Sequence, residues 1–164
     1  MNDAVRVYIA LGSNLNDPRA QVESGLKHLA RLPQSQWRGA SCLYRTPPMG
    51  PAPQPDYINA VAALDTHLSA HALLDELLAI ERAHGRIRDG QRWGPRTLDL
   101  DILLYGETTL SDARLTLPHP GIAERAFVLL PLAELAPDLI VPGKGTLRGL
   151  VQACNVTGIE RLSA

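Results

Sequence analysis

The chain has 164 residues, 45% of them hydrophobic, which is enough for one domain over residues 1–164 with a single core. Its net charge of −1 excludes a general nucleic-acid binder, because such proteins need a clear excess of lysine and arginine. No apolar run approaches the ~20 residues of a membrane helix, and the N-terminus lacks a signal-peptide pattern, so we expect a cytoplasmic protein. The two cysteines, Cys42 and Cys154, lack metal-ligand spacing and favour idle thiols over a disulfide or a zinc site.

The first part of the chain predicts two strands around one helix. Residues 5–11 form an apolar strand pattern, which Gly12-Ser13-Asn14 would end in a turn. The following helix would be capped by Asp17, and residues 37–45 predict the second strand. Five prolines between residues 47 and 55 then exclude regular structure, because proline lacks an amide donor, so this segment should be a stiff loop.

The middle of the chain repeats this alternation. Residues 57–64 predict a strand, and Ser69 opens an amphipathic helix that Gly85 would end. A further strand follows at residues 97–104. The order is that of an α+β, ferredoxin-like sandwich with a βαββαβ core, in which helices pack on one face of an antiparallel sheet. The C-terminal additions would be a strand pair and two short helices, at residues 106–117, 124–135 and 147–151.

Two aspartates stand close together on the last core strand. Asp99 and Asp101 alternate with apolar residues, so both side chains project from one face, with Cα atoms ~7 Å apart. Like charges this close favour a bound cation, and carboxylates suit Mg²⁺, which commonly takes one or two of them together with substrate phosphates. The alternative is an ordinary strand with a polar outer face. Because aspartate is rare in strands, we predict a metal site.

Arginines gather just before this strand. The cluster, opposed only by Asp89, consists of Arg82, Arg86, Arg88, Arg92 and Arg96. Guanidinium groups suit phosphate oxygens, so the cluster predicts a polyanionic ligand, with a solvated basic loop as the alternative. A nucleoside triphosphate would satisfy both the arginines and the aspartates. The chain has neither a Walker-type loop nor a kinase glycine-rich loop, which excludes the common nucleotide-binding designs.

Three further positions could contact a ligand. Tyr57 and Asn59 lie on one face of their strand, where a flat ring beside an amide suits a planar heterocycle. Taken singly, Tyr57 and Phe127, the only phenylalanine, favour core positions, and Asn59 favours an edge or a turn. His119 stands between two prolines that restrict the backbone and could hold its imidazole toward an anion. A surface-loop histidine is the alternative.

The chain resembles the 6-hydroxymethyl-7,8-dihydropterin pyrophosphokinase family along essentially its whole length. The motifs that carry the resemblance are YIALGSNL at 8–15, YRTPP at 44–48, QPDYINA at 54–60, GRIR at 85–88, RWGPRTLDLD at 92–101, PHP at 118–120 and ERAFVL at 124–129. One departure is Gly121, which stands where the family commonly has a basic residue. A different Mg²⁺-dependent nucleotidyl- or phosphotransferase, or a ferredoxin-like ligand-sensing module, is the alternative on the residues alone.

The resemblance implies an enzyme of folate synthesis that transfers pyrophosphate from ATP to the pterin hydroxymethyl group, by in-line attack on the β-phosphorus that releases AMP. It implies two Mg²⁺ ions at Asp99 and Asp101, with catalytic contacts from Arg86 and Arg96. The expected ATP contacts are Glu81, Arg88, Arg92, Trp93, Ile102, Arg114, Thr116, His119 and Arg125. The expected pterin contacts are Thr46, Pro47, Met49, Tyr57, Asn59, Trp93 and Phe127. We expect a monomer with no nucleic-acid or membrane partner.

Overall fold

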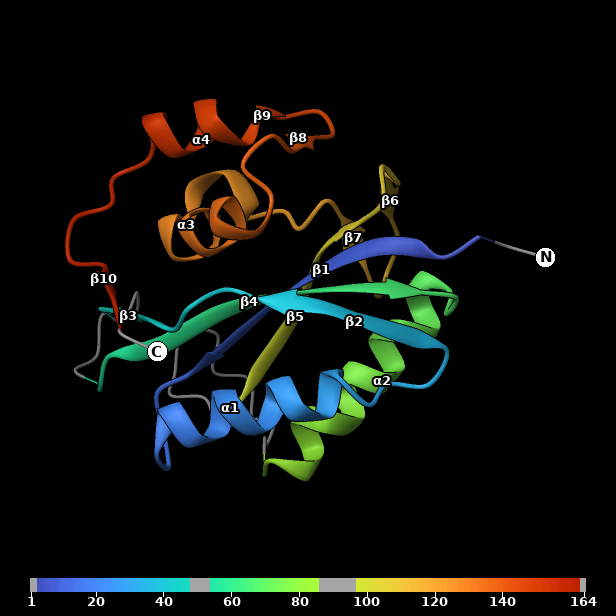
Figure 1. Ribbon diagram of the computed structural model, residues 1–164, viewed down its shortest axis with the longest axis horizontal. Coiled ribbons are helices and arrows are strands. Elements are labelled where there is room, and N and C mark those ends of the chain that lie inside the picture. Colours follow the sequence, from blue (N-terminus) through green and yellow to red (C-terminus); the bar gives the residue numbers. More distant parts are fainter. Residues whose placement is uncertain (1–2, 48–53, 86–96, 163–164) are drawn as a thin grey trace.

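An antiparallel sheet organises the molecule around two long strands. The computed structural model describes residues 3–47, 54–85 and 97–162 (Figure 1). The elements before residue 85 are β1 (Val5–Ser13), α1 (Pro18–Leu29), β2 (Ser35–Ala40), β3 (Tyr44–Thr46), β4 (Tyr57–Thr66) and α2 (Ala70–Ala83). The elements after residue 97 are β5 (Asp99–Tyr105), β6 (Leu110–Ser111), β7 (Thr116–Leu117), the 3₁₀ helix η1 (Ile122–Glu124), α3 (Ala126–Leu135), β8 (Ile140–Val141), β9 (Gly145–Thr146), α4 (Leu147–Ala153) and β10 (Glu160–Arg161).

The strand order confirms the predicted fold class. The main sheet runs β10-β3-β4-β1-β5, and β2 also pairs with β4. β1 pairs with β4 along its whole length, from Val5 opposite Thr66 to Ser13 opposite Ile58. The path β5-β1-β4-β2, with α1 and α2 as its helices, is that of a ferredoxin-like sandwich.

The helix starts follow the predicted capping residues. The Asp17 carboxylate accepts a hydrogen bond from the Ala20 amide at 3.4 Å, and Ser69 Oγ accepts one from the Ala72 amide at 3.1 Å. Gly85 follows α2 with φ +80°, a conformation that glycine adopts without steric cost.

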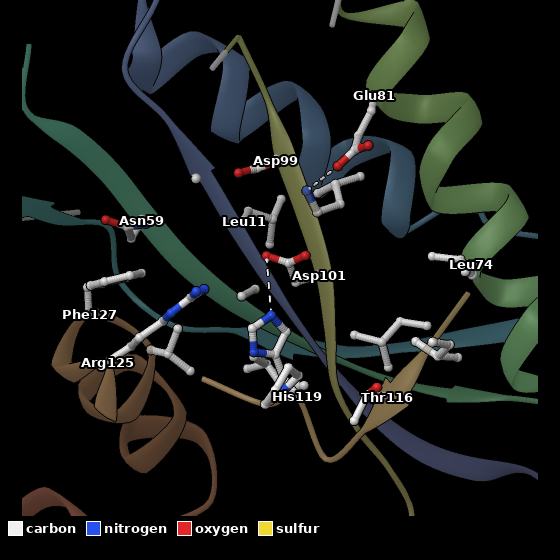
Figure 2. Close-up of a pocket in the computed structure, with 18 of the residues that line it drawn as sticks. Leu11, Asn59, Leu74, Glu81, Asp99, Asp101, Thr116, His119, Arg125 and Phe127 are labelled. Atoms are coloured by element: carbon white, nitrogen blue, oxygen red, sulfur yellow. Dashed lines mark hydrogen bonds and ion pairs between the residues drawn. The ribbon is translucent and has the colours of Figure 1, made fainter. Parts of the chain in front are cut away.

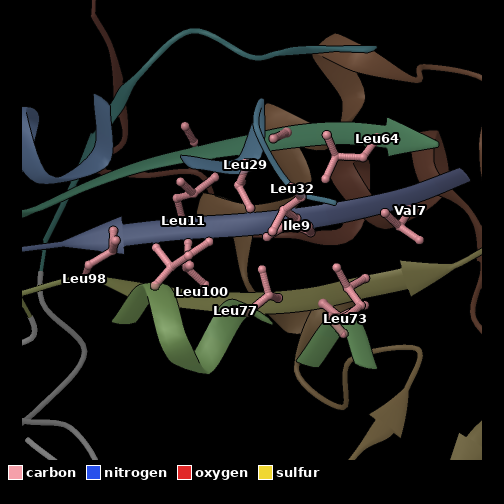
Figure 3. Packing of buried hydrophobic residues seen from close by; sticks show 14 of the residues in the cluster. Val7, Ile9, Leu11, Leu29, Leu32, Leu64, Leu73, Leu77, Leu98 and Leu100 are labelled. Atoms are coloured by element: carbon pink, nitrogen blue, oxygen red, sulfur yellow. The ribbon is translucent and has the colours of Figure 1, made fainter. Parts of the chain in front are cut away.

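Helices cover both faces of the sheet, whereas the sequence analysis expected them on one face. In Figure 1, α1 and α2 lie on one side of the sheet, and α3 and α4 lie on the other. The core under α1 and α2 includes Ile9, Leu11, Leu29, Leu64, Leu73 and Leu77 (Figure 3). The core under α3 and α4 includes Tyr8, Val61, Ala63, Leu129, Leu132 and Leu147. Residues 60–64 of β4 are apolar at consecutive positions because both of its faces are buried.

Several short elements differ from the prediction. The predicted strand at 37–45 is divided into β2 and β3, and the predicted pair within 106–117 is the β6–β7 hairpin. β8, β9 and β10 were not predicted, because two-residue strands show no periodicity. No helix in the described ranges combines the length and the apolar content that crossing a membrane requires.

Candidate active site

A cavity of about 500 Å³ lies between the sheet, α3 and the β6–β7 hairpin (Figure 2). Its lining comes from β1, β3, β4, β5, α2, the hairpin and the start of α3. The predicted site residues that line it are Thr46, Pro47, Tyr57, Asn59, Glu81, Asp99, Asp101, Ile102, Arg114, Thr116, His119, Arg125 and Phe127. The predicted contacts Met49, Arg86, Arg88, Arg92, Trp93 and Arg96 lie outside the described residues.

The two aspartates project from β5 into the cavity. Asp99 is half-buried opposite Gly12, and Asp101 is half-buried opposite Ala10, while Leu100 between them is buried. The predicted alternation of this strand is therefore confirmed. Because both cross-strand partners are small, no side chain from β1 covers the carboxylates.

Glu81 of α2 closes the outer edge of β5. Glu81 is only 3% exposed, and its Oε2 accepts a hydrogen bond from the Leu100 amide at 2.8 Å. β5 is the last strand on this side of the sheet, so this amide points away from β1. A buried amide without a partner would be costly. Glu81 satisfies it and fixes the backbone between Asp99 and Asp101.

A β-bulge in β5 brings His119 to the site. The pairing register with β1 shifts between Tyr8 and Ile9, which leaves Leu103 without a partner on β1. The Leu103 carbonyl instead accepts a hydrogen bond from the His119 amide at 3.0 Å. Bulges commonly redirect backbone groups beside active sites in this way.

The imidazole of His119 presents one nitrogen to the cavity. Nδ1 accepts a hydrogen bond from the Gly121 amide at 3.0 Å, so the proton of the neutral ring lies on Nε2, which is 4.0 Å from Asp101 Oδ2 (Figure 2). Burial lowers the pKa of His119, the Asp101 carboxylate opposes this effect, and Arg125 adds to it. At neutral pH His119 is therefore a neutral N–H donor.

The hairpin side of the cavity is apolar with charged residues at its rim. Leu74 and Leu78 of α2 face Leu115 across this part of the lining. Asp112 shapes the turn, since its carboxylate accepts hydrogen bonds from the amides of Arg114 and Leu115 at 2.9 Å each. These backbone hydrogen bonds lower the pKa of Asp112, and the one donated by the Arg114 amide has the largest effect. The exposed Arg114 guanidinium is itself paired with Asp75.

The opposite side of the cavity carries the aromatic rings. Tyr57 and Phe127 line it from β4 and α3, and both are only partly buried, with Phe127 also packed against the core under α3 and α4. The buried Asn59 accepts a hydrogen bond at Oδ1 from the Thr46 hydroxyl at 2.7 Å. This bond fixes which way the amide points, so its NH₂ group is the donor that remains.

Two glycines give site residues the room they need. A Cβ on Gly12 would lie 2.9 Å from Asn59 Nδ2, and one on Gly121 would lie 2.6 Å from Arg125 Nε. The departure at Gly121 thus leaves a space that the Arg125 guanidinium fills. The same guanidinium lies 5.9 Å from the Phe127 ring centre. The sequence analysis placed Gly12 in a turn, whereas β1 continues to Ser13. A glycine inside a strand signals close approach of another group, and this signal was missed.

The carboxylates fit a hard metal ion that shares its ligands with a substrate. Among the residues of the described ranges, no group of three or more His, Cys, Asp or Glu side chains could hold a metal ion. Asp99 and Asp101 alone supply oxygen ligands from one strand face. Mg²⁺ keeps several waters and usually takes one or two carboxylates plus phosphate oxygens, so the donor set suits it.

Comparisons with known proteins agree with the sequence motifs. The family model described as 7,8-dihydro-6-hydroxymethylpterin-pyrophosphokinase (HPPK) matches residues 8–137. The chain is 55% identical over 157 residues to the 2-amino-4-hydroxy-6-hydroxymethyldihydropteridine pyrophosphokinase of Pseudomonas aeruginosa, covering 96% of each. It is 46% identical to the protein of the same name from Methylorubrum extorquens, covering 96% of this chain and 98% of the relative.

A solved structure shows the same fold. The chain superposes on a Plasmodium falciparum HPPK-DHPS protein with a TM-score of 0.74 over 93% of its own length, at 14% identity. It spans 46% of that longer protein, so the likeness concerns one part of it.

Proposed function

Because the chain belongs to the 7,8-dihydro-6-hydroxymethylpterin-pyrophosphokinase family, we propose that the cavity beside Asp99 and Asp101 is its active site. The chain is an ATP-dependent enzyme that transfers pyrophosphate to the hydroxymethyl group of a dihydropterin in folate synthesis. The observation that carries the proposal is the position of the aspartate pair, between an aromatic side and an apolar side of one cavity. The reaction needs two bound substrates to meet at a charged centre.

The pterin is assigned to the aromatic side. Tyr57 and Phe127 can stack on its two faces, and the orientation of the Asn59 amide leaves NH₂ donors for its polar edge. Thr46 and Pro47 lie at the same side, at the end of β3. Stacking positions a flat ring but does not fix its rotation within the plane. Hydrogen bonds from the Asn59 amide would fix that rotation.

The nucleotide is assigned to the hairpin side. Leu74, Leu78 and Leu115 offer apolar surface for a base, and Arg114 and Thr116 stand at the rim. His119 lies beside Asp101, and Arg125 lies between His119 and Phe127 (Figure 2), so a neutral N–H donor and a guanidinium are available to phosphate oxygens. The predicted contacts among residues 86–96 remain part of the proposal through the family resemblance alone.

Asp99 and Asp101 would hold Mg²⁺, two ions in our proposal, which neutralise phosphate charge when bound. The residues of the chain then contribute by orientation. The rings and Asn59 hold the hydroxymethyl group in line with the β-phosphorus, and His119 and Arg125 hold the triphosphate. Positioning and charge stabilisation carry the catalysis, since phosphoryl transfer needs little covalent help from the protein.

The remaining expectations belong to the same proposal. We propose a single domain over residues 1–164 that acts as a monomer. We also propose that it acts in the cytoplasm, where cells keep the ATP that the reaction consumes.

Two substitutions on opposite sides of the cavity test the assignment. Phe127→Ala should weaken pterin binding by roughly 1–3 kcal/mol and leave binding of a Mg-ATP analogue unchanged. Arg114→Ala should weaken binding of the nucleotide analogue by about 1 kcal/mol or more and leave pterin binding unchanged. Asp75→Ala, which removes the partner of Arg114 but keeps the guanidinium, is the matched control. Calorimetric titration that finds equal losses for both ligands in both variants would refute the two-sided assignment.

A further inference from the structure

Glu134 joins three separate parts of the chain outside the cavity. Its carboxylate accepts a hydrogen bond at Oε2 from the Cys42 amide at 2.6 Å and one at Oε1 from the Tyr44 hydroxyl at 2.9 Å. Arg161 Nε of β10 lies 3.7 Å from Oε1. One side chain of α3, 25% exposed, thus holds the start of β3 and the last described strand.

Both elements that Glu134 joins carry residues of the proposed pterin side. Phe127 precedes Glu134 by seven residues in α3, so the two side chains lie on the same face of the helix. Tyr44 is the cross-strand partner of Asn59, and Thr46, two residues further along the same face of β3, holds the Asn59 amide. The spacing between ring and amide therefore depends on how α3 sits against β3.

Among the described residues, apolar packing and a short strand ladder also contribute to that spacing. α3 packs on the sheet through apolar side chains such as Val128, Leu129 and Leu132, whose contacts are not directional. β3 has three residues, so its ladder with β4 is short. Hydrogen bonds to a carboxylate are directional and stronger than neutral ones.

The Tyr44 phenol remains a donor under all ordinary conditions. Burial raises its pKa to about 12, and the hydrogen bond to Glu134 adds to the effect. The bond between β3 and α3 is therefore not broken by titration of the phenol at neutral pH.

We propose that Glu134 is a positioning residue for the pterin, which sets the distance between Phe127 on α3 and the Thr46–Asn59 pair on the sheet. The inference rests on the proposed placement of the pterin at the aromatic side. Glu134 is not among the residues that line the cavity, so its loss would change pterin binding through the two elements it joins.

A matched pair of tyrosines separates positioning from general stability. Tyr44→Phe removes the bond to Glu134, and Tyr105→Phe removes the equally part-buried bond from the Tyr105 hydroxyl to the Leu68 carbonyl, at the far end of β5. Each loses one phenol hydrogen bond. At saturating ATP, we expect Tyr44→Phe to raise the KM for the pterin about tenfold, because small misplacements of a binding group are costly. The KM for ATP should not change. Tyr105→Phe should change neither. Equal effects of the two variants, or no effect of Tyr44→Phe, would overturn the proposal.

Substitutions of Glu134 itself provide the rescue test. A glutamine can still accept from the Cys42 amide and can donate to the Tyr44 oxygen, so Glu134→Gln should keep the pterin KM within about threefold of wild type. Glu134→Ala should raise it by more than Tyr44→Phe does. If Glu134→Ala does not fold, the tyrosine pair decides. A glutamine variant as impaired as the alanine variant would contradict the hydrogen-bond origin.

Phe127→Ala distinguishes failure of this inference from failure of the proposed function. If Phe127→Ala raises the pterin KM while the Tyr44 and Glu134 variants do not, the pterin side stands and only the positioning role is wrong. If none of them does, the pterin has been assigned to the wrong side of the cavity.

Discussion

At the scale of single residues, the site depends on which side chains are small. Gly12 and Ala10 face the two aspartates across the β1–β5 ladder, and Gly12 also faces Asn59 across the β1–β4 ladder. One strand therefore leaves room for both the charged centre and the amide. The carboxylates remain close to one another, which is unfavourable until a cation lies beside them.

We expect Asp101→Ala, and likewise Asp99→Ala, to lower kcat by at least ~10²-fold, the scale for losing a preorganised electrostatic contributor. The free energy of unfolding should change by less than about 0.5 kcal/mol or increase, because the substitution removes a repulsion. Asp138→Ala, at a carboxylate that is 87% exposed and far along the chain, is the control. Near-normal turnover of either variant at saturating Mg²⁺ would show that the metal assignment is wrong.

Gly12→Ala tests the close approach of β1 to Asn59. Its Cβ would lie 2.9 Å from Asn59 Nδ2, so the amide must move or the strands must separate. We expect pterin binding to weaken, because the Asn59 amide is displaced from the position in which Thr46 holds it, with nucleotide binding unchanged. Calorimetry with the pterin measures this directly. Unchanged pterin affinity would mean that Asn59 does not contact the ligand.

The residues that could be predicted are those whose signal is local. Asp99 and Asp101 are recognisable because alternation within one strand places them on one face. The roles of Gly12 and Glu134 were not predicted, because each depends on a partner from a distant part of the chain. The pterin contact of Phe127 is implied only by the family resemblance, since a lone phenylalanine carries no local signal of exposure.

At the scale of elements, a charged cluster joins three strands at the end away from the cavity. Asp65 of β4 accepts hydrogen bonds from Arg6 of β1 and from Arg38 of β2, at 2.5 and 2.6 Å. Arg38 reaches it because the β2–β4 register shifts between Trp37 and Gly39, a bulge that redirects the side chain. Bulge positions depend on pairing between strands, so periodicity did not reveal this one.

The Asp65 cluster predicts a pH-dependent contribution to stability. The hydrogen bond from Arg6 and the one from Arg38 hold the pKa of Asp65 below its ordinary value of 3.8. The folded state thus binds the proton less readily than the unfolded state, and the contribution is present above pH ~4 and is lost as the pH falls through the lower, folded-state pKa. Asp65→Asn should lower the free energy of unfolding at pH 7, because it removes the charge that both arginines pair with. The loss should be only about 1 kcal/mol, because both arginines are exposed.

Denaturant unfolding across pH checks this expectation. The stability difference between wild type and Asp65→Asn should shrink as the pH falls below ~4. A difference that stays constant from pH 7 to pH 3 would mean that the carboxylate charge contributes nothing.

At the scale of the whole molecule, the cavity proposed as the active site lies between the ferredoxin-like core and its C-terminal additions. The core supplies Asn59, Asp99 and Asp101, and the additions supply His119, Arg125 and Phe127. Strand and helix order predicted the core, because its elements are long and periodic. The packing of α3 and α4 on the second face was not predicted, although the apolar residues on both faces of β4 are a signal of it.

We propose that this cavity moves the β,γ-pyrophosphoryl unit of ATP to the pterin hydroxyl group. Phosphorus NMR of the chain with Mg²⁺, ATP and 6-hydroxymethyl-7,8-dihydropterin tests it most directly, because each position of attack leaves different products. We predict one AMP for each pterin consumed and a pterin product with two coupled phosphorus signals, both formed at least ~10²-fold more slowly with Asp101→Ala. Formation of ADP, or of free pyrophosphate with a nucleotidylated pterin, would contradict the claim even if both substrates bind.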